Sequence, residues 1–194
     1  MTGGETDRER DDDCRRRLRG SPGERSGFAV LYENVRMAIR GEGTVVISGV
    51  TPEEVFDFVI DPAQYTKADT KMIWVTKLAD TDDGMIARED GRFLGRFRGS
   101  VVTRYRWQAP HRIDVTLEHG VPSALHAWFE IEATGDGTRL RHVETMDFGH
   151  GVFGHLYDLV ARRWFARSVG AEVAEIGRLL EAGERGRGIE AHQT

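Results

Sequence analysis

Three side chains in the second half of the sequence could carry out acid–base chemistry: His142, Glu144 and Tyr105. His142 and Glu144 lie two residues apart in TRLRHVETMDF (138–148), where apolar and polar residues alternate as in a β-strand. Side chains two apart on a strand project from the same face. A histidine that titrates near neutrality, beside a glutamic acid whose pKa is raised by burial, would make an acid–base pair. The same spacing also fits an exposed pair at the end of a sheet.

The neighbouring predicted strands would surround this pair with apolar side chains and a few polar ones. In 85–108 the arginines share one face, which we expect to be solvated, and the aromatic and aliphatic residues share the other. We therefore predict an apolar ligand pocket with convergent polar groups, the alternative being a filled core. Trp128 is expected on the outer face or at a partner contact. The inward-facing residues predicted from alternation are Phe97, Val101, Thr103, Tyr105, Trp107, Ile113, Val115, Leu117, His119, Leu125, Ala127, Phe129, Ile131, Leu140, His142, Glu144 and Met146.

A long amphipathic helix is predicted for the segment from about residue 151 to residue 182. We interpret its C-terminal half as a structural segment that packs against the sheet. Its N-terminal half would contact a ligand through a second face, or else pack on two short helices. That second face consists of Phe153, Tyr157, Val160 and Trp164. The main apolar stripe consists of Val152, Leu156, Leu159, Ala166, Val169, Val173, Ile176 and Leu180.

The remaining elements give the order strand, two short helices, six meandering strands and the long helix. Thr51, Pro52 and Glu54 form a capped helix start, and Asp61-Pro62 ends that helix. Gly41-Glu42-Gly43 interrupts the first strand as a bulge or a tight hairpin. Residues 85–108 must hold two strands, with the turn at Asp90-Gly91 or, preferably, at 94–96. The predicted segments are strands 36–48, 72–79, 85–108 (two), 112–119, 124–133 and 138–148, and helices 51–61 and 63–69.

This order predicts an α+β helix-grip fold. A curved antiparallel sheet of about seven strands would have two short helices after strand one and a long C-terminal helix packed in its concavity. The domain is expected to span 28–184, between a disordered charged tail at 1–27 and a disordered C-terminal tail at 185–194. A charged helix in 1–27 that docks on a partner or on acidic lipid is the alternative for that segment.

Composition excludes several classes of function. The net charge of −5 is well mixed, so we expect no nucleic-acid surface. No apolar run approaches a membrane span and the N-terminus lacks a secretory signal, so we expect no integral membrane segment and a cytoplasmic protein. Cys14 is the single cysteine, and the seven histidines do not have zinc-ligand spacings. No phosphate-binding glycine motif is present. We therefore expect neither a metal site nor a cofactor.

Several segments resemble the START/Bet v 1-like superfamily, most closely its polyketide cyclase/dehydrase and lipid-transport branch. GTVVIS (43–48) leading into TPEEVFDFV (51–59) resembles the opening of that branch. WQAPHRI (107–113) resembles its turn before a strand, and GDGTRL (135–140) resembles its penultimate hairpin. The likeness covers roughly residues 36–182. Its motifs are structural and contain no catalytic residue.

The resemblance implies a deep apolar cavity between the sheet and the long helix. Members use such a cavity for lipids, sterols, quinones or polyketide intermediates; some catalyse cyclisation or dehydration there, and many only bind. We therefore expect binding of a small hydrophobic or amphipathic molecule. The alternatives are an aromatase/cyclase-type enzyme that uses Tyr105, His142 and Glu144, and a protein-interaction module that uses the same groove.

Overall fold

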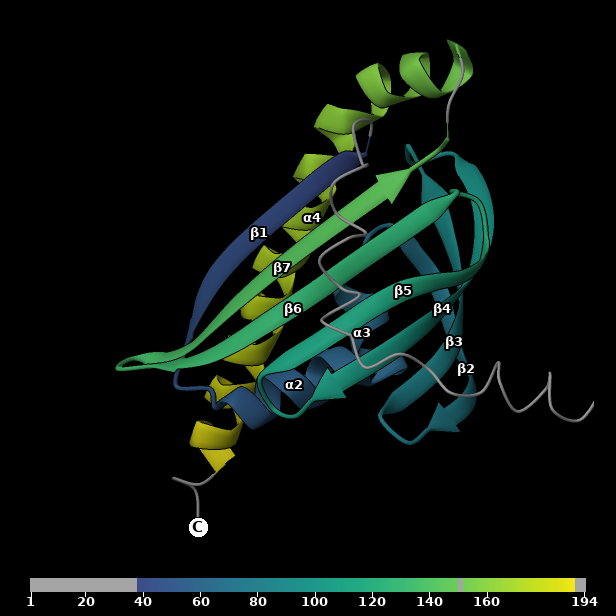
Figure 1. Cartoon of the computed structure of the whole chain (residues 1–194). Coiled ribbons are helices and arrows are strands. Elements are labelled where there is room, and N and C mark those ends of the chain that lie inside the picture. The colour runs from purple at the N-terminus through teal and green to yellow at the C-terminus, as the bar shows by residue number, and fades with distance from the viewer. Residues whose placement is uncertain (1–37, 150–151, 191–194) are drawn as a thin grey trace, which may run out of the picture. The chain divides into compact units, whose positions relative to one another are not determined.

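The computed structural model describes the backbone of residues 38–149 and 152–190, and the side chains of 38–149 and 161–183. The predicted tail at 1–27, Cys14, and the side chains of Phe153, Tyr157 and Val160 lie outside the described residues. The elements are β1 (Ile39–Ser48), α2 (Pro52–Ile60), α3 (Pro62–Ala68), β2 (Met72–Thr81), β3 (Gly84–Phe93), β4 (Phe97–Gln108), β5 (Arg112–Gly120), β6 (Ala124–Thr134), β7 (Gly137–Asp147) and α4 (Val152–Glu190) (Figure 1).

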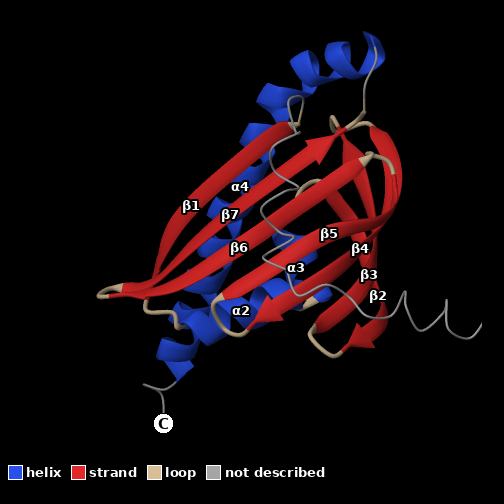
Figure 2. Ribbon diagram, in the orientation of Figure 1, coloured by secondary structure: helices blue, strands red, loops and turns tan. Residues whose placement is uncertain are grey.

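The predicted helix-grip architecture is confirmed. The strands form one antiparallel seven-stranded sheet in the order β1-β7-β6-β5-β4-β3-β2. The helices of the described residues, α2, α3 and α4, lie on one face of this sheet (Figure 2), and α4 runs along β1. The meander leaves β1 and β2 as the two edges, and α4 covers the inner side of the first of them.

Two glycines of β1 allow α4 to approach the sheet closely. A Cβ atom at Gly41 would lie 2.5 Å from Val169 Cγ2, and one at Gly43 would lie 2.9 Å from Val173 Cγ2. Both predictions for Gly41-Glu42-Gly43, a bulge or a hairpin, are wrong, because β1 pairs with β7 without a break from Ile39 to Ser48. The glycines serve the packing of the helix and leave the strand uninterrupted.

The start of α2 has the predicted cap. The Thr51 hydroxyl accepts from the Glu54 backbone N–H, and the Glu54 carboxylate accepts from the Thr51 N–H at 2.9 Å. Asp61 ends α2 and caps α3, because its side chain accepts from the Ala63 N–H. These caps fix where the two short helices begin; α2 packs on β6 and β7, and α3 packs on α4.

The long helix is longer than predicted, since it ends at Glu190. Of its predicted stripe, Val169, Val173 and Ile176 are fully buried, whereas Ala166 is exposed. Ala161 and Phe165 are buried instead of Ala166. They lie eight and four residues before Val169, so the buried stripe of the helix continues toward the N-terminus in steps of four. In the described part of the chain, no helix is both long enough and apolar enough to cross a membrane.

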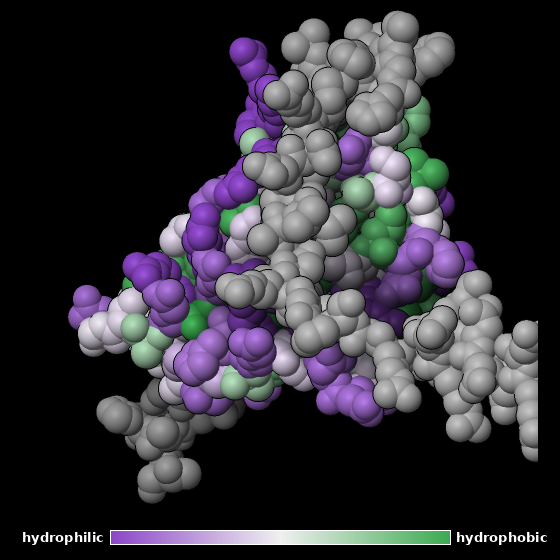
Figure 3. Space-filling view, in the orientation of Figure 1, coloured by the Kyte–Doolittle hydropathy of each residue, from purple (hydrophilic) through white to green (hydrophobic). Residues whose placement is uncertain are grey.

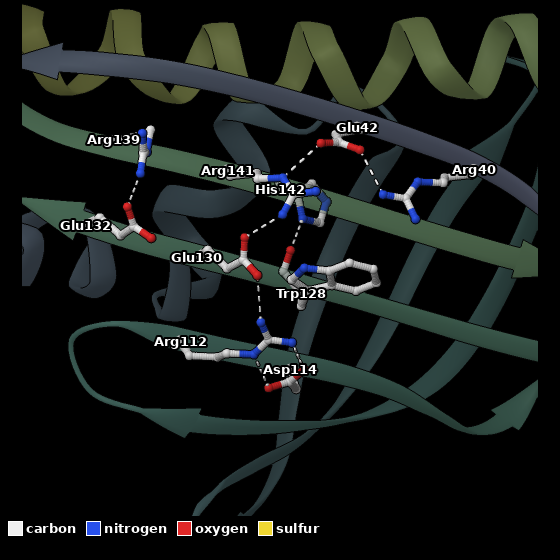
Figure 4. A network of polar contacts seen from close by, with 10 residues as sticks. All are labelled: Arg40, Glu42, Arg112, Asp114, Trp128, Glu130, Glu132, Arg139, Arg141 and His142. Atoms are coloured by element: carbon white, nitrogen blue, oxygen red, sulfur yellow. Dashed lines mark hydrogen bonds and ion pairs between the residues drawn. The ribbon is translucent and has the colours of Figure 1, made fainter. Parts of the chain in front are cut away.

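The outer face of the sheet carries a ladder of ion pairs (Figure 4). Arg141 bridges Glu42 at 2.8 Å and Glu130 at 2.7 Å, and Arg112 joins Glu130 to Asp114. The guanidinium groups of Arg40 and Arg112 lie 5.7 and 5.8 Å from the Trp128 ring, which places this tryptophan on the outer face as predicted. Much of the visible surface over these strands is hydrophilic (Figure 3).

The favoured turn between β3 and β4 is confirmed, because the chain reverses at Leu94 and Gly95, both with positive φ. The inward orientation predicted for His119 is wrong, since His119 is exposed. The register between β4 and β5 shifts between Val102 and Thr103, which pair with His119 and Leu117. This irregularity ends the simple alternation that the prediction assumed.

Candidate functional site

A cavity of about 240 Å³ opens where the β3–β4 hairpin, the end of β7 and α4 meet. Its walls are mainly apolar, and buried charged groups line part of it. Phe97 and Val121, at 56% and 80% exposure, lie at its opening. The lining residues are Lys71, Met72, Glu89, Gly91, Arg92, Phe93, Phe97, Arg98, Gly99, Val101, Val121, Pro122, Leu125, Glu144, Met146, Phe148, Trp164 and Phe165.

A pair of glycines helps to keep this space open. Gly91 of β3 and Gly99 of β4 are cross-strand partners, and both line the cavity. A Cβ atom at Gly91 would lie 2.9 Å from the carbonyl oxygen of Lys71, so this position requires glycine. A Cβ atom at Gly99 would have no atom within 4 Å. Gly91 thus allows the Lys71 backbone to approach β3, and Gly99 leaves open space at the lining.

Lys71 is the centre of a buried ion cluster. Its ammonium lies 2.7 Å from the Glu172 carboxylate, 3.2 Å from Glu144 and 3.4 Å from Asp69. Tyr65 donates a hydrogen bond of 2.6 Å to the other oxygen of Glu172. These groups come from α3, the α3–β2 connection, β7 and α4. The cluster therefore joins the helical layer to the sheet.

A second buried carboxyl group lies on the neighbouring strands. Thr103 and Tyr105 of β4 both donate to Oε1 of Glu89, at 2.5 and 2.7 Å. Both donors are neutral hydroxyl groups, and Glu89 is 5% exposed. Glu89 lines the main cavity and also a smaller one of about 20 Å³ that reaches Asp69, Tyr105 and His142. The two cavities share Met72, Glu89, Leu125 and Glu144.

Burial dominates the proton affinities of these groups. It raises the pKa of Glu144 to about 7 and that of Asp69 to about 6, against the opposing attraction of the Lys71 ammonium. Burial also raises the pKa of Glu89, although the hydrogen bonds from Thr103 and Tyr105 act in the opposite direction. Lys71 keeps its proton, because the carboxylates around it hold its pKa well above the usual value in spite of burial.

His142 is a neutral member of the cluster. Its Nδ1 lies 3.0 Å from the Trp128 carbonyl oxygen, its ring stacks on Phe129 at 3.9 Å, and its Nε2 lies 3.5 Å from Glu172. Burial, with the nearby Lys71 charge, lowers the pKa of His142 to about 3. The expectation of a histidine that titrates near neutrality is therefore wrong, whereas the expected raised pKa of Glu144 is found.

The sequence over residues 38–181 matches the model of the family described as polyketide cyclase / dehydrase and lipid transport. The chain belongs to this family. No curated protein matches it. The fold and the family are START-like, a group that includes polyketide cyclases and proteins that bind hydrophobic ligands.

Solved structures share the fold of this family member at low sequence identity. A protein from Thermus thermophilus aligns with a TM-score of 0.64 and 15% identity, over 75% of this chain and 98% of its own. A START superfamily protein from Mycobacterium smegmatis aligns with a TM-score of 0.58 and 20% identity, over 73% of this chain and 98% of its own. The Zhui aromatase/cyclase from a Streptomyces species aligns with a TM-score of 0.58 and 15% identity, over 75% of this chain and 98% of its own. At these identities the likeness concerns the fold alone.

The predicted site residues of this family member whose side chains the structure describes fall into four groups. Phe97, Val101 and Trp164 line the main cavity, together with the candidate Glu144; Tyr105, Val115, Phe129 and His142 line the smaller one. Thr103 is buried and reaches the site through Glu89. Outside both linings lie Trp107, Leu117, Leu140 and His119. Trp107 packs edge-on against Phe56 at 6.2 Å, and Leu140 is part of the core.

Sequence reasoning missed Lys71, Asp69, Glu89 and Glu172. Two of them had a usable signal. Glu89 follows Met85 and Ala87 at a spacing of two, on the inward face of β3, and Glu172 follows Val169 and precedes Ile176 in the buried stripe of α4. An acid on an otherwise apolar face indicates a buried charge, which needs a partner. Lys71 and Asp69 precede β2 in a short connection without periodicity, and no pattern marks them.

One combination within the cluster has the spacing of metal ligands. Atoms of His142, Glu144 and Glu172 lie within 4.8 Å of one another. Lys71 forms ion pairs with two of these three residues, so a positive charge already balances their carboxylates. A metal ion there would compete with the ammonium. The prediction of no metal site stays a prediction.

Proposed function

We propose that the protein binds a small amphipathic molecule in the cavity beside Lys71. The supporting observation is the contrast within its lining. Aromatic side chains such as Phe93, Phe148 and Trp164 are half-buried and pack edge-on at 4.8 to 5.2 Å, whereas Lys71, Glu89 and Glu144 are buried. A largely apolar space with a few placed polar groups is typical of ligand sites.

The size of the cavity limits the ligand. At about 240 Å³ it lies just below the usual range of roughly 300–1,000 Å³ for ligand pockets. A compact molecule of one or two rings fits better than a long lipid chain. Its apolar body would lie against Leu125, Met146 and Phe165, and its polar end would reach the buried carboxyl groups.

A neutral fluorescent probe tests this proposal. N-phenyl-1-naphthylamine should bind with a large gain in fluorescence. Gly99→Trp places a ring in the cavity from a position where a Cβ atom meets nothing, and it should weaken binding at least tenfold. Gly135→Trp is the matched control, because Gly135 lies in the β6–β7 turn and is equally free of neighbours. Equal binding by both variants, or none by the wild type, would overturn the proposal.

A second function, proton transfer of the cyclase/dehydrase kind, has one specific observation in its favour. Glu144 lines the cavity, has a pKa of about 7, and lies 3.2 Å from the Lys71 ammonium. A base with a pKa near the working pH is effective in proton transfer. We propose that the Glu144 carboxylate would take the α-proton of a β-dicarbonyl compound and then return a proton to the same carbon. This role keeps Glu144 of the predicted catalytic set and does not use His142 or Tyr105.

Hydrogen exchange tests this second function without knowledge of the natural substrate. A 1-aryl-1,3-butanedione in D2O should exchange its α-protons faster with the wild-type protein than with Glu144→Gln. Both proteins should bind the naphthylamine probe equally. Exchange that does not depend on Glu144 would contradict the proton-transfer role and leave the binding function standing.

A further inference from the structure

The buried groups beside the cavity contain more acids than bases. Within the described part of the chain, the buried charged groups are the four carboxyl groups of Asp69, Glu89, Glu144 and Glu172 and the single ammonium of Lys71. His142 adds no positive charge, because its pKa of about 3 keeps it neutral. Buried carboxylates need positive partners or bound protons, and here they outnumber the cation by four to one.

Lys71 has no capacity left for an anionic ligand. An ammonium has three hydrogens, and three carboxyl groups lie at 2.7, 3.2 and 3.4 Å from its nitrogen. A ligand carboxylate would have to displace one of them, and it would then face the other buried acids at short range. The cluster therefore disfavours an anion, although it contains a lysine.

Acceptors, in contrast, are available. Both bonds to Glu89 end on its Oε1, and both come from neutral donors. Among the described residues, Oδ2 of Asp69 is a fully buried oxygen without a hydrogen-bond partner, and Asp69 lines the smaller cavity. A buried acceptor without a donor is costly, which favours a ligand that brings hydrogens.

The other positively charged groups of the lining lie toward solvent. The Phe165 ring, which lines the same cavity, already contacts the Lys71 ammonium, whose nitrogen lies 6.0 Å from the ring centre. The two arginines of the lining, Arg92 and Arg98, are cross-strand partners and exposed, so water screens their charge from the buried end. These arginine charges therefore lie at the solvent side, and the excess of acids lies inside.

From this arrangement we infer that the ligand carries a protonated amine at one end of its apolar body, received by Glu89 and Glu144. This inference rests on the proposed binding function and is independent of proton transfer. The carboxyl groups of the free protein hold protons more tightly than usual, because burial raises the pKa of both, and an incoming ammonium replaces those protons. Binding of the amine should therefore release protons.

Three naphthalene compounds of one size test the inference by calorimetry at pH 6, where Glu144, with a pKa of about 7, still holds its proton. They are 1-naphthylmethylamine, 1-naphthalenemethanol and 1-naphthoic acid, which present an ammonium, a neutral hydroxyl and a carboxylate. We expect the amine to bind at least tenfold more tightly than the alcohol, and the acid to bind most weakly. In buffers of different ionisation enthalpy, amine binding should show proton release and alcohol binding should show none.

Two variants locate the preference. Glu89→Gln and Glu144→Gln should each reduce the ratio of amine to alcohol affinity about tenfold, whereas Glu53→Gln, an exposed change on α2, should leave it unchanged. The ligand series on the wild type decides the question even if one variant does not fold. If the acid binds best, or all three bind alike, the inference is wrong and the binding function stands. If none binds and the neutral probe also fails, the binding function itself is wrong.

Discussion

The Lys71 ammonium lies 2.7 Å from the Glu172 carboxylate, although the two residues are 101 positions apart. The contact joins the start of β2 to the middle of α4, beneath the candidate cavity. Glu172 is 1% exposed and also accepts from Tyr65 of α3. One carboxylate thus ties both helices to the strand that leads into the site, so the cluster has a structural role in addition to the proposed ligand contact.

Removal of the Lys71 charge should strongly destabilise the protein. Lys71→Met leaves three buried carboxyl groups without their ammonium. We expect the free energy of unfolding at pH 8 to fall by about 3–5 kcal/mol, the range for a buried pair that loses one partner. Urea denaturation followed by circular dichroism measures this change.

Lys77→Met, on the strand β2 that follows Lys71, is the matched control. Lys77 pairs with Asp80, and its side chain is half exposed. The change should alter stability by less than about 0.5 kcal/mol, as for surface ion pairs. Similar losses in both variants would show that the Lys71 cluster contributes no more than a surface pair.

The raised pKa of Glu144 predicts a pH-dependent effect of Glu144→Gln. Because the folded protein holds this proton up to about pH 7 and the unfolded chain releases it near pH 4.5, the stability that Glu144 contributes falls as the pH rises between these values. Glutamine does not titrate. The free energy of unfolding of Glu144→Gln, taken relative to that of the wild type, should therefore rise by about 1–3 kcal/mol from pH 5 to pH 8.

Urea denaturation of both proteins at the two pH values gives this difference, in which the titration of Asp69 largely cancels. Glu42→Gln serves for comparison. Hydrogen bonds from Arg40 and Arg141 lower the pKa of Glu42, so this variant should show no gain over the same range. A constant difference between Glu144→Gln and the wild type would mean that Glu144 is ionised throughout.

The close packing of α4 on β1 predicts a steric effect at Gly41. An alanine Cβ atom would lie 2.5 Å from Val169 Cγ2, a distance that requires the helix or the strand to shift. Gly41→Ala should cost about 1–3 kcal/mol of stability, as overpacked core positions do. Adding Val169→Ala should cost less in this background than in the wild type, by at least about 1 kcal/mol.

Gly170→Ala provides the contrast within α4. An added Cβ atom there has no atom within 4 Å, so the change should stabilise the helix by roughly 0.5–1 kcal/mol.

Urea denaturation measures the stability of all these variants. If the effects of Gly41→Ala and Val169→Ala are additive, the two residues do not contact as described.

Much of the fold could be predicted from the sequence because its signals are local. The Thr51–Glu54 capping box, the favoured β3–β4 turn and the alternation in β6 and β7 each depend on neighbours within a few residues. The site depends on distant contacts instead. Lys71 pairs with Glu144 and Glu172, which are 73 and 101 positions away, and no spacing predicts such a meeting.

The errors have the same physical origin. The proton affinity of His142 depends on how deeply the Phe129 ring, the Trp128 carbonyl and the Lys71 charge enclose it, and none of these is encoded by its place on β7. The orientation of His119 differs from the prediction because the register of β5 against β4 shifts near this residue. Such shifts follow from the pairing of strands and not from the alternation within one strand.

Methionine methyl groups offer the most direct test of the central claim, that the cavity beside Lys71 is a ligand site. Met72 and Met146 line the cavity, whereas Met85 is buried in the core outside both linings. In methyl-13C-methionine protein titrated with N-phenyl-1-naphthylamine, the neutral probe of the binding function, the NMR signals of Met72 and Met146 should shift to saturation, and that of Met85 should stay in place. In Gly99→Trp these shifts should be lost. No shift at Met72 and Met146, or equal shifts at all three methionines, would contradict the account.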